Sequence, residues 1–244
     1  MHTSYYEPFN NTKKNFRKDL ETLLSMLKDN KKFSFSKYAD GEYAILRNIS
    51  ITVQPCDNWT FTADVDSKYR NALMDSFTYY EPGYYVGISC PCCQPMSHVA
   101  WMRDTLTTPK EYVTWANLFV NGNYDFFIQN FIPEFKRRKV VIVASEKGSA
   151  SNLPFKVDEY IPIKQTAWRD NYNLVDSMPF RDDKDILYLF CAGPLGNMLA
   201  HRMWKQNKNN TYMDIGSTLN PWLVGKNRDY MHVNSPYAGQ GCTW

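Results

Sequence analysis

The feature that most constrains the fold is a regular alternation of short apolar runs with amphipathic stretches. The clearest run, residues 140–143, has four consecutive apolar residues that are mostly β-branched, which is typical of a strand buried on both faces of a parallel sheet. Residues 15–29 carry one apolar helical face and precede a strand-like segment at 33–38. Further strands are predicted at 84–90, 137–146, 159–163, 185–193 and 211–216, and helices at 97–108, 194–206 and twice within 110–132.

Strands that alternate with helices along a chain fold into a parallel sheet that is covered on both faces. We therefore expect a single three-layer α/β domain with a largely parallel sheet over residues 1–244. Residues 220–244 contain two prolines and three glycines, and they are predicted to form an irregular tail or lid.

Composition narrows the class of protein. The chain has 244 residues, 43% of them hydrophobic, and a net charge of +3, which argues against disorder and against a broad nucleic-acid-binding face. It contains no apolar run of about 18 residues and no apolar leader after Met1, so we expect a cytoplasmic protein without a membrane span. Its six cysteines include Cys90, Cys92 and Cys93, but a structural zinc site needs a second ligand pair, which the chain does not offer at close spacing.

Ligands of open parallel sheets bind beyond the carboxyl ends of the strands, so the turns that follow the predicted strands are where chemistry is expected. These turns contain Asp40, Gly41 and Glu42, then Glu146, then Gly193 and Pro194, and finally Asp214, Gly216 and Ser217.

The turn Asp40-Gly41-Glu42 places two carboxylates at the end of a strand, an arrangement suited to Mg²⁺ or Mn²⁺ when a substrate phosphate completes the ligand set. The alternative is a plain turn in which Glu42 starts a helix and complements its dipole. The turn Gly193-Pro194 opens a helix whose N-terminus could face a phosphate. The sequence lacks the glycine patterns of dinucleotide folds, P-loops and α/β-hydrolases.

Three blocks in the same order resemble the GT-D type glycosyltransferases. Residues 33–42, FSFSKYADGE, resemble that family's Phe-Ser-Arg-Tyr-Gly-Asp-Gly-Glu segment, with Lys37 in place of Arg and Ala39 in place of Gly. Residues 192–202 resemble its Gly-Pro turn and the following helix, and residues 212–221 resemble its last strand and Asp-x-Gly-Ser turn.

The resemblance implies a Rossmann-like glycosyltransferase that takes a nucleotide-sugar donor, often a UDP-sugar. A divalent metal, Mn²⁺ or Mg²⁺, would bridge the diphosphate to Asp40 and Glu42. The donor would lie against residues of the matched blocks, namely Lys37, Tyr38, Asp40, Gly41, Gly193, Pro194, Gly216 and Ser217.

Asp214 and Glu146 are the remaining carboxylates expected at this edge, and either could take the acceptor proton. We favour Asp214 as this base, because it lies in a matched block. The expected acceptor is a glycan or glycoprotein. The basic run 136–139 and the many aromatic residues leave open a hydroxylated base of DNA instead. Acceptor-contacting residues are expected among Trp168, Arg169, the tyrosines at 79–80 and 84–85, Arg228, Tyr230 and His232. A nucleotide-sugar hydrolase and a non-catalytic nucleotide-sugar binder are the alternatives of other classes.

Overall fold

A computed structural model describes residues 12–53, 59–91 and 93–225. Its main sheet has seven strands in the order β5-β4-β1-β9-β8-β6-β7, and all pairings within this sheet are parallel. The strands are β1 (Ser34–Lys37), β4 (Tyr84–Ile88), β5 (Val113–Trp115), β6 (Lys139–Ser145), β7 (Glu159–Ile163), β8 (Ile186–Cys191) and β9 (Thr211–Asp214).

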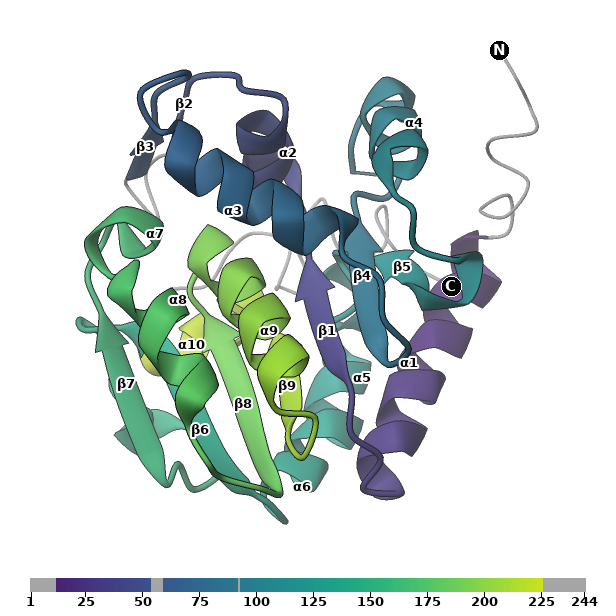
Figure 1. Ribbon diagram of the computed structural model, residues 1–244. Coiled ribbons are helices and arrows are strands. Elements are labelled where there is room, and N and C mark those ends of the chain that lie inside the picture. The colour runs from purple at the N-terminus through teal and green to yellow at the C-terminus, as the bar shows by residue number, and fades with distance from the viewer. Residues whose placement is uncertain (1–11, 54–58, 92, 226–244) are drawn as a thin grey trace.

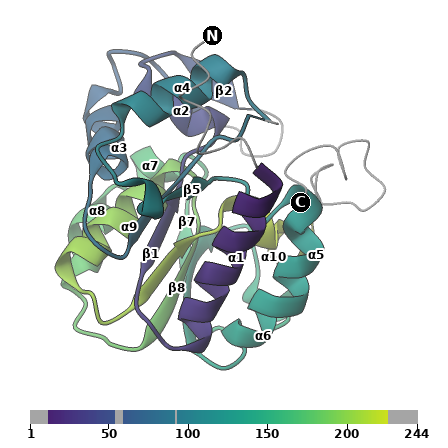
Figure 2. The same cartoon turned by 90° about the vertical axis from the view of Figure 1, so that its right-hand side faces the viewer.

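Helices cover both faces of the sheet, as Figures 1 and 2 show. One face carries α1 (Thr12–Lys28), α5 (Tyr124–Phe126) and α6 (Ile132–Phe135), with a π-helical turn at Phe127–Phe131. The other carries α3 (Ser67–Thr78), α7 (Ala167–Asp170), α8 (Asn173–Ser177) and α9 (Pro194–Gln206). Beyond the carboxyl ends of the strands lie α2 (Asp40–Leu46), α4 (Met96–Thr105) and the antiparallel hairpin of β2 (Ile51–Val53) and β3 (Trp59–Phe61). The expected three-layer architecture is therefore confirmed.

The apolar spacing of α1 explains how that helix packs. The five residues of its predicted apolar face are buried, namely Phe16, Leu20, Leu23, Leu24 and Leu27. Phe16 stacks on Trp115 of β5 with 5.4 Å between ring centroids. The periodicity of the sequence thus predicts both the helix and the side that it turns to the core.

Several segments differ from the prediction, among them α7 and α8, which form where the sequence predicts no element. Residues 113–115 form an edge strand, β5, where the sequence predicts a helix, because a three-residue strand is too short to show an alternation. The hairpin and α3 fall in a stretch for which the sequence predicts no element. The predicted irregular tail begins with a short helix, α10 (Asn220–Leu223), and its part from residue 226 onward lies outside the described residues.

The connections after β1 and β9 leave the sheet toward opposite faces. The chain runs from β1 through α2 to α3, which packs on α9. From β9 it runs toward the α5 face, where the hydroxyl of Tyr124 donates to the carbonyl oxygen of Thr218. In parallel sheets such a divergence opens a crevice at the carboxyl ends, and here it falls between two strands that end in Lys37 and Asp214.

Candidate active site

The carboxyl ends of β1 and β9 bring together three ionisable side chains, Lys37, Glu42 and Asp214, which we call the charged cluster. Lys37 and Asp214 end neighbouring parallel strands, and Glu42 lies in the first turn of the helix that follows β1. Glu42 and Asp214 are buried, at 7% and 1% exposure. One ammonium thus faces two carboxyl groups that have little access to water.

Asp214 has the environment of a strongly perturbed carboxyl group. Burial raises its pKa to about 7 against the lowering effect of Lys37, and the charge of Glu42 adds to the rise. Its Oδ1 accepts the N–H of Gly216 at 3.1 Å, and its Oδ2 lies 3.4 Å from the backbone nitrogen of Lys37. A Cβ on Gly196 of α9 would lie 3.2 Å from Oδ1, so the helix packs directly on this carboxyl group.

Glu42 caps the start of α2, as in the alternative in which this residue begins a helix. Its Oε2 accepts the backbone N–H of Ala39 at 2.9 Å, which satisfies a free donor before α2. Burial raises the pKa of Glu42, against the lowering effect of Lys37. Ala39 has a φ of −97°, so this position does not need a glycine, and the alanine is accommodated without backbone strain. Asp40, the first residue of α2, is exposed.

The ammonium of Lys37 lies over the turn that follows β9. Gly216 has a φ of +53°, and a Cβ at this position would overlap Lys37 Cε and lie 2.8 Å from its Nζ. Glycine is therefore required here both by the backbone conformation and by the path of the lysine. The same ammonium opposes the pKa shifts of Glu42 and Asp214, and it is the positive charge of the cluster.

The N-terminus of α9 borders the charged cluster. Gly193 has a φ of +53°, is exposed, and has no atom within 4 Å of where a Cβ would lie, while Pro194 is the first, buried residue of the helix. The amide nitrogen of Asn197 donates to Ser36 Oγ at 3.1 Å and to the carbonyl oxygen of Lys37 at 2.5 Å. This amide fixes the helix N-terminus against the end of β1.

Other predicted residues lie in different environments. Tyr38 is fully buried and points into the core, where its hydroxyl contacts those of Ser36, Ser76 and Tyr84, and burial raises its pKa to about 12. Ser217 is partly buried in the turn after β9. Glu146 is exposed beyond the end of β6, two strands from β9, or roughly 10 Å at the usual strand spacing.

The expected acceptor-contacting residues are engaged in packing, lie at the other end of the strands, or fall outside the described residues. Trp168 is buried at 1% exposure, and Arg169 is paired with Asp66. The tyrosines at 79–80 and 84–85 lie before or at the start of β4. They are therefore at the amino ends of the strands, opposite the carboxyl ends where the charged cluster lies. Arg228, Tyr230 and His232 lie outside the described residues.

The basic run 136–139 also lies at the opposite edge of the sheet, just before and at the start of β6. Arg137 and Arg138 pair with the buried Glu134 at 2.8 and 2.9 Å, and Arg138 also donates to the carbonyl oxygen of Leu27 at the end of α1. Arg138 therefore joins α6 to α1, whereas Arg137 pairs with Glu134 within its own segment.

The cysteines of the 90–93 segment differ in their surroundings. Cys90 is buried at the end of β4 and Cys93 is exposed, whereas Cys92 lies outside the described residues. Within the described ranges, no three His, Cys, Asp or Glu side chains gather as a metal site. No helix among these residues has the length and apolar character that a membrane span needs.

Two residues near the site have no role in the sequence-based prediction. Asn197 lies in the second matched block, four residues after Gly193, and its position at the start of a helix is a usable signal. Trp59 of the hairpin packs on Gly41, where a Cβ would lie 3.2 Å from the indole ring. Nothing in the local sequence around Trp59 indicates this contact, because the two residues belong to different elements.

No protein-family description matches the sequence, and no curated protein is similar to it. Solved structures do match its fold. One is described as "A New Glycosyltransferase (DUF1792) from Streptococcus sanguinis"; it is 13% identical, with a TM-score of 0.59 over 92% of this chain and 92% of its own. Another is described as the highly conserved domain of unknown function 1792 with a distinct glycosyltransferase fold; it is 13% identical, with a TM-score of 0.58 over 90% and 86% of the two chains.

At this identity the likeness establishes the fold, which extends over nearly the whole of both chains. The resemblance to GT-D type glycosyltransferases that the three sequence blocks carry is thereby confirmed at the level of the fold.

Proposed function

We propose that this protein is a glycosyltransferase that moves a sugar from a nucleotide-sugar donor, a UDP-sugar in the first instance, to a hydroxyl acceptor. The observation that carries the proposal is the charged cluster beside the α9 N-terminus, at the crevice of a fold shared with glycosyltransferase structures. Fold alone does not specify chemistry, so the proposal rests on what these residues can do.

The residues at the start of α2 suit a divalent cation. Asp40 offers an exposed carboxylate, and the second oxygen of Glu42 is not the one that caps Ala39. Burial raises the pKa values of Glu42 and Asp214 against the lowering effect of Lys37, and a bound cation would favour the ionised form of both carboxyl groups. Mg²⁺ and Mn²⁺ are commonly held by one or two carboxylates and substrate phosphates. When bound, such an ion stabilises the negative charge of a leaving diphosphate.

The chain itself supplies two further sources of positive potential for that leaving group. The N-terminus of α9 carries the positive end of a 13-residue helix, and the open space around Gly193 admits a ligand to it. Lys37 adds a full charge, held in place over Gly216. We propose that the diphosphate lies between these groups, so that charge developing on it meets fixed donors.

The acceptor hydroxyl needs a base, and the two candidate carboxylates differ in access. Burial raises the pKa of Asp214 to about 7, which suits a general base, but this carboxyl group is enclosed by Gly196 and engaged by two backbone N–H groups. Glu146 is open to solvent at the same edge. We propose Glu146 as the base and Asp214 as the residue that holds Lys37 and the 214–217 turn.

We propose a glycan or glycoprotein as the acceptor. The basic run 136–139 does not support DNA as the acceptor. The run lies at the amino end of β6, away from the charged cluster, and its two arginines pair with Glu134. We further propose that the protein works in the cytoplasm, where nucleotide-sugar donors are made available to such enzymes.

The function is tested by a nucleotide-release assay over a panel of nucleotide sugars with Mn²⁺, with and without acceptor glycans. A transferase releases nucleotide at a rate that rises with acceptor, a hydrolase releases it without acceptor, and a binder releases none. Glu146→Gln and Asp214→Asn then separate the two carboxylates. Loss of turnover with intact UDP binding identifies the base, whereas loss of UDP binding and melting temperature together identifies a structural carboxylate.

A further inference from the structure

We infer that Trp59 is a positioning residue for the acidic turn Asp40-Gly41-Glu42, and that α7 holds Trp59 in place. The inference rests on the proposed function, since it assigns a role in placing the carboxylates that would hold the metal. Trp59 and α7 lie outside all three sequence blocks of the glycosyltransferase resemblance.

The first observation is the contact between Trp59 and Gly41. A Cβ on Gly41 would lie 3.2 Å from Cζ2 and 3.3 Å from Cη2 of the indole, closer than ordinary van der Waals contact. Gly41 is a helical residue without a positive φ, so its backbone does not demand glycine. What excludes a larger residue between Asp40 and Glu42 is therefore the indole ring of Trp59.

The second observation is that Trp59 is itself held from behind. Its exposure is 8%, and its ring meets that of Trp168 edge to face, with 6.2 Å between centroids and an interplanar angle of 87°. Trp168 belongs to α7, directly after β7, and it also packs against Phe61 and Tyr69. In Figure 1 the hairpin that carries Trp59 lies above α7.

The third observation is an ion pair that ties α7 to the hairpin. Arg169 Nη2 lies 2.9 and 2.8 Å from the two carboxylate oxygens of Asp66, which is 3% exposed. Asp66 also accepts the N–H of Thr62 at 2.8 Å, just after β3. The same guanidinium lies 5.0 Å from the Trp168 ring, so one arginine holds both the hairpin and the tryptophan.

These contacts join distant parts of the carboxyl edge. The segment after β7 thus supports the acidic turn that follows β1. Three strands, β9, β8 and β6, lie between β7 and β1 in the sheet. Packed aromatic rings are stiff, and a displacement of about 1 Å at a binding group can cost on the order of a hundredfold in rate. Trp59 thus sets where the carboxylates of the turn stand.

The test is a double-mutant cycle between Gly41→Ala and Trp59→Phe. Two quantities are measured on the full chain: the Mn²⁺-dependent dissociation constant of UDP, by calorimetry, and the melting temperature. Gly41→Ala is expected to weaken UDP binding about tenfold or more, because the methyl pushes the turn off the indole. Trp59→Phe removes the outer ring atoms, so the double variant is expected to bind UDP within about threefold of the wild type.

A matched control is Gly83→Ala, at the opposite edge of the sheet. A Cβ there would lie 2.7 Å from Cζ2 of Trp204, and φ is +87°, so the melting temperature should fall while UDP binding stays unchanged. Normal UDP binding by Gly41→Ala, or no recovery in the double variant, would overturn the role of Trp59 and leave the proposed function standing. Absence of Mn²⁺-dependent UDP binding in the wild type would overturn the proposed function and this role with it.

Discussion

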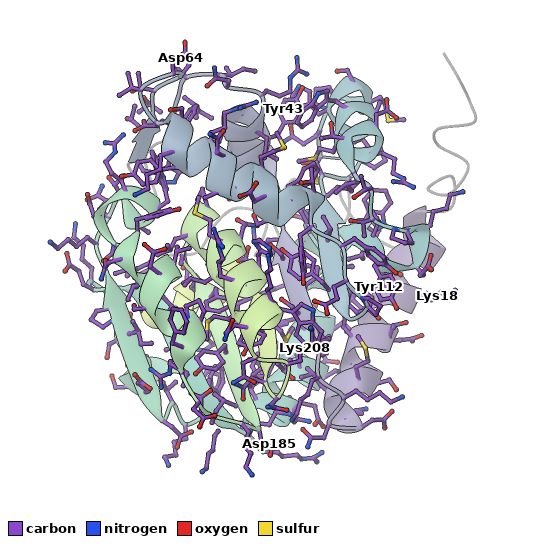
Figure 3. The ribbon with its side chains drawn as sticks, viewed as in Figure 1. Lys18, Tyr43, Asp64, Tyr112, Asp185 and Lys208 are labelled. Carbon is purple, nitrogen blue, oxygen red and sulfur yellow. The ribbon has the colours of Figure 1, made fainter. Side chains whose placement is uncertain are left out.

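Carboxyl groups have opposite surroundings at the two ends of the sheet's strands, which we call the amino edge and the carboxyl edge. At the amino edge, carboxylates meet cations near the surface: Lys32 pairs with Asp185 at 2.7 Å, and Arg181 pairs with Glu159 and with Asp183. Figure 3 shows Asp185 and Lys208 at this end of the molecule. At the carboxyl edge, Glu42 and Asp214 are buried and share one lysine.

The pKa values record this difference. Lys32 holds the pKa of Asp185 below its ordinary value, whereas burial raises those of Glu42 and Asp214. Carboxylates at the amino edge are thus compensated within the chain. At the carboxyl edge, burial disfavours the charged forms of Glu42 and Asp214, and a bound cation would favour them. For this reason we propose that the chemistry takes place at that edge.

The largest expected effect is that of Asp40→Asn. The change removes an exposed carboxylate from the proposed metal site, so transfer in Mn²⁺ should fall about a hundredfold or more, as measured by steady-state sugar transfer. Asp185→Asn at the amino edge is the matched control and should transfer normally. Equal activity of the two variants would remove the distinction between the edges.

The next effect is on stability, at the glycine under Lys37. Gly216→Ala combines a φ of +53° with overlap on Lys37, and it should lower the free energy of unfolding by about 2–3 kcal/mol and weaken UDP binding. Gly225→Ala has a similar φ of +64° but no atom within 4 Å, so it should cost only about 1 kcal/mol. Chemical denaturation of both variants checks this, and equal losses would mean that Lys37 is not held by Gly216.

A pH-dependent effect is expected at Asp19, a partly buried carboxyl group away from both edges. Burial raises its pKa to about 6, against a hydrogen bond from Thr114 Oγ1 at 2.6 Å. Because the folded pKa lies above the unfolded value, this group stabilises the fold below about pH 4, and that contribution is lost as pH rises through 6. Asp19→Asn should therefore gain about 1–3 kcal/mol over the wild type at pH 8 and nothing at pH 4.

Denaturation curves at the two pH values measure this gain. UDP binding by Asp19→Asn should stay unchanged, since the residue lies on α1 against β5. A variant that is no more stable than the wild type at pH 8 would show that the Asp19 carboxylate is compensated in the folded protein.

The smallest effect is expected from Lys32→Ala. Its ion pair with Asp185 joins a partly buried ammonium to an exposed carboxylate, and water screens such pairs. The melting temperature should change by less than about two degrees, and UDP binding should not change. A clear loss of UDP binding would contradict the assignment of function to the carboxyl edge alone.

Much of this arrangement could be predicted from the sequence, for a physical reason. The buried strands of a parallel sheet are apolar runs, and their carboxyl ends share one edge, so Lys37, Asp40 and Asp214 could be expected together. Missed were β5 and the β2–β3 hairpin, whose strands have three residues each and show no periodicity. The contact of Trp59 with Gly41 is also invisible in the sequence, because only tertiary packing creates it.

The central claim is that the carboxyl edge binds a nucleotide-sugar together with a divalent cation. It is tested most directly by the melting temperature of the wild type and of Asp40→Asn with a panel of nucleotide sugars, with Mn²⁺ or with a chelator. A ligand that binds the folded state raises its stability with concentration. We predict a marked rise for one nucleotide sugar that needs both Mn²⁺ and Asp40; a rise that survives the chelator and the Asp40→Asn change, or no rise with any donor, would contradict the claim.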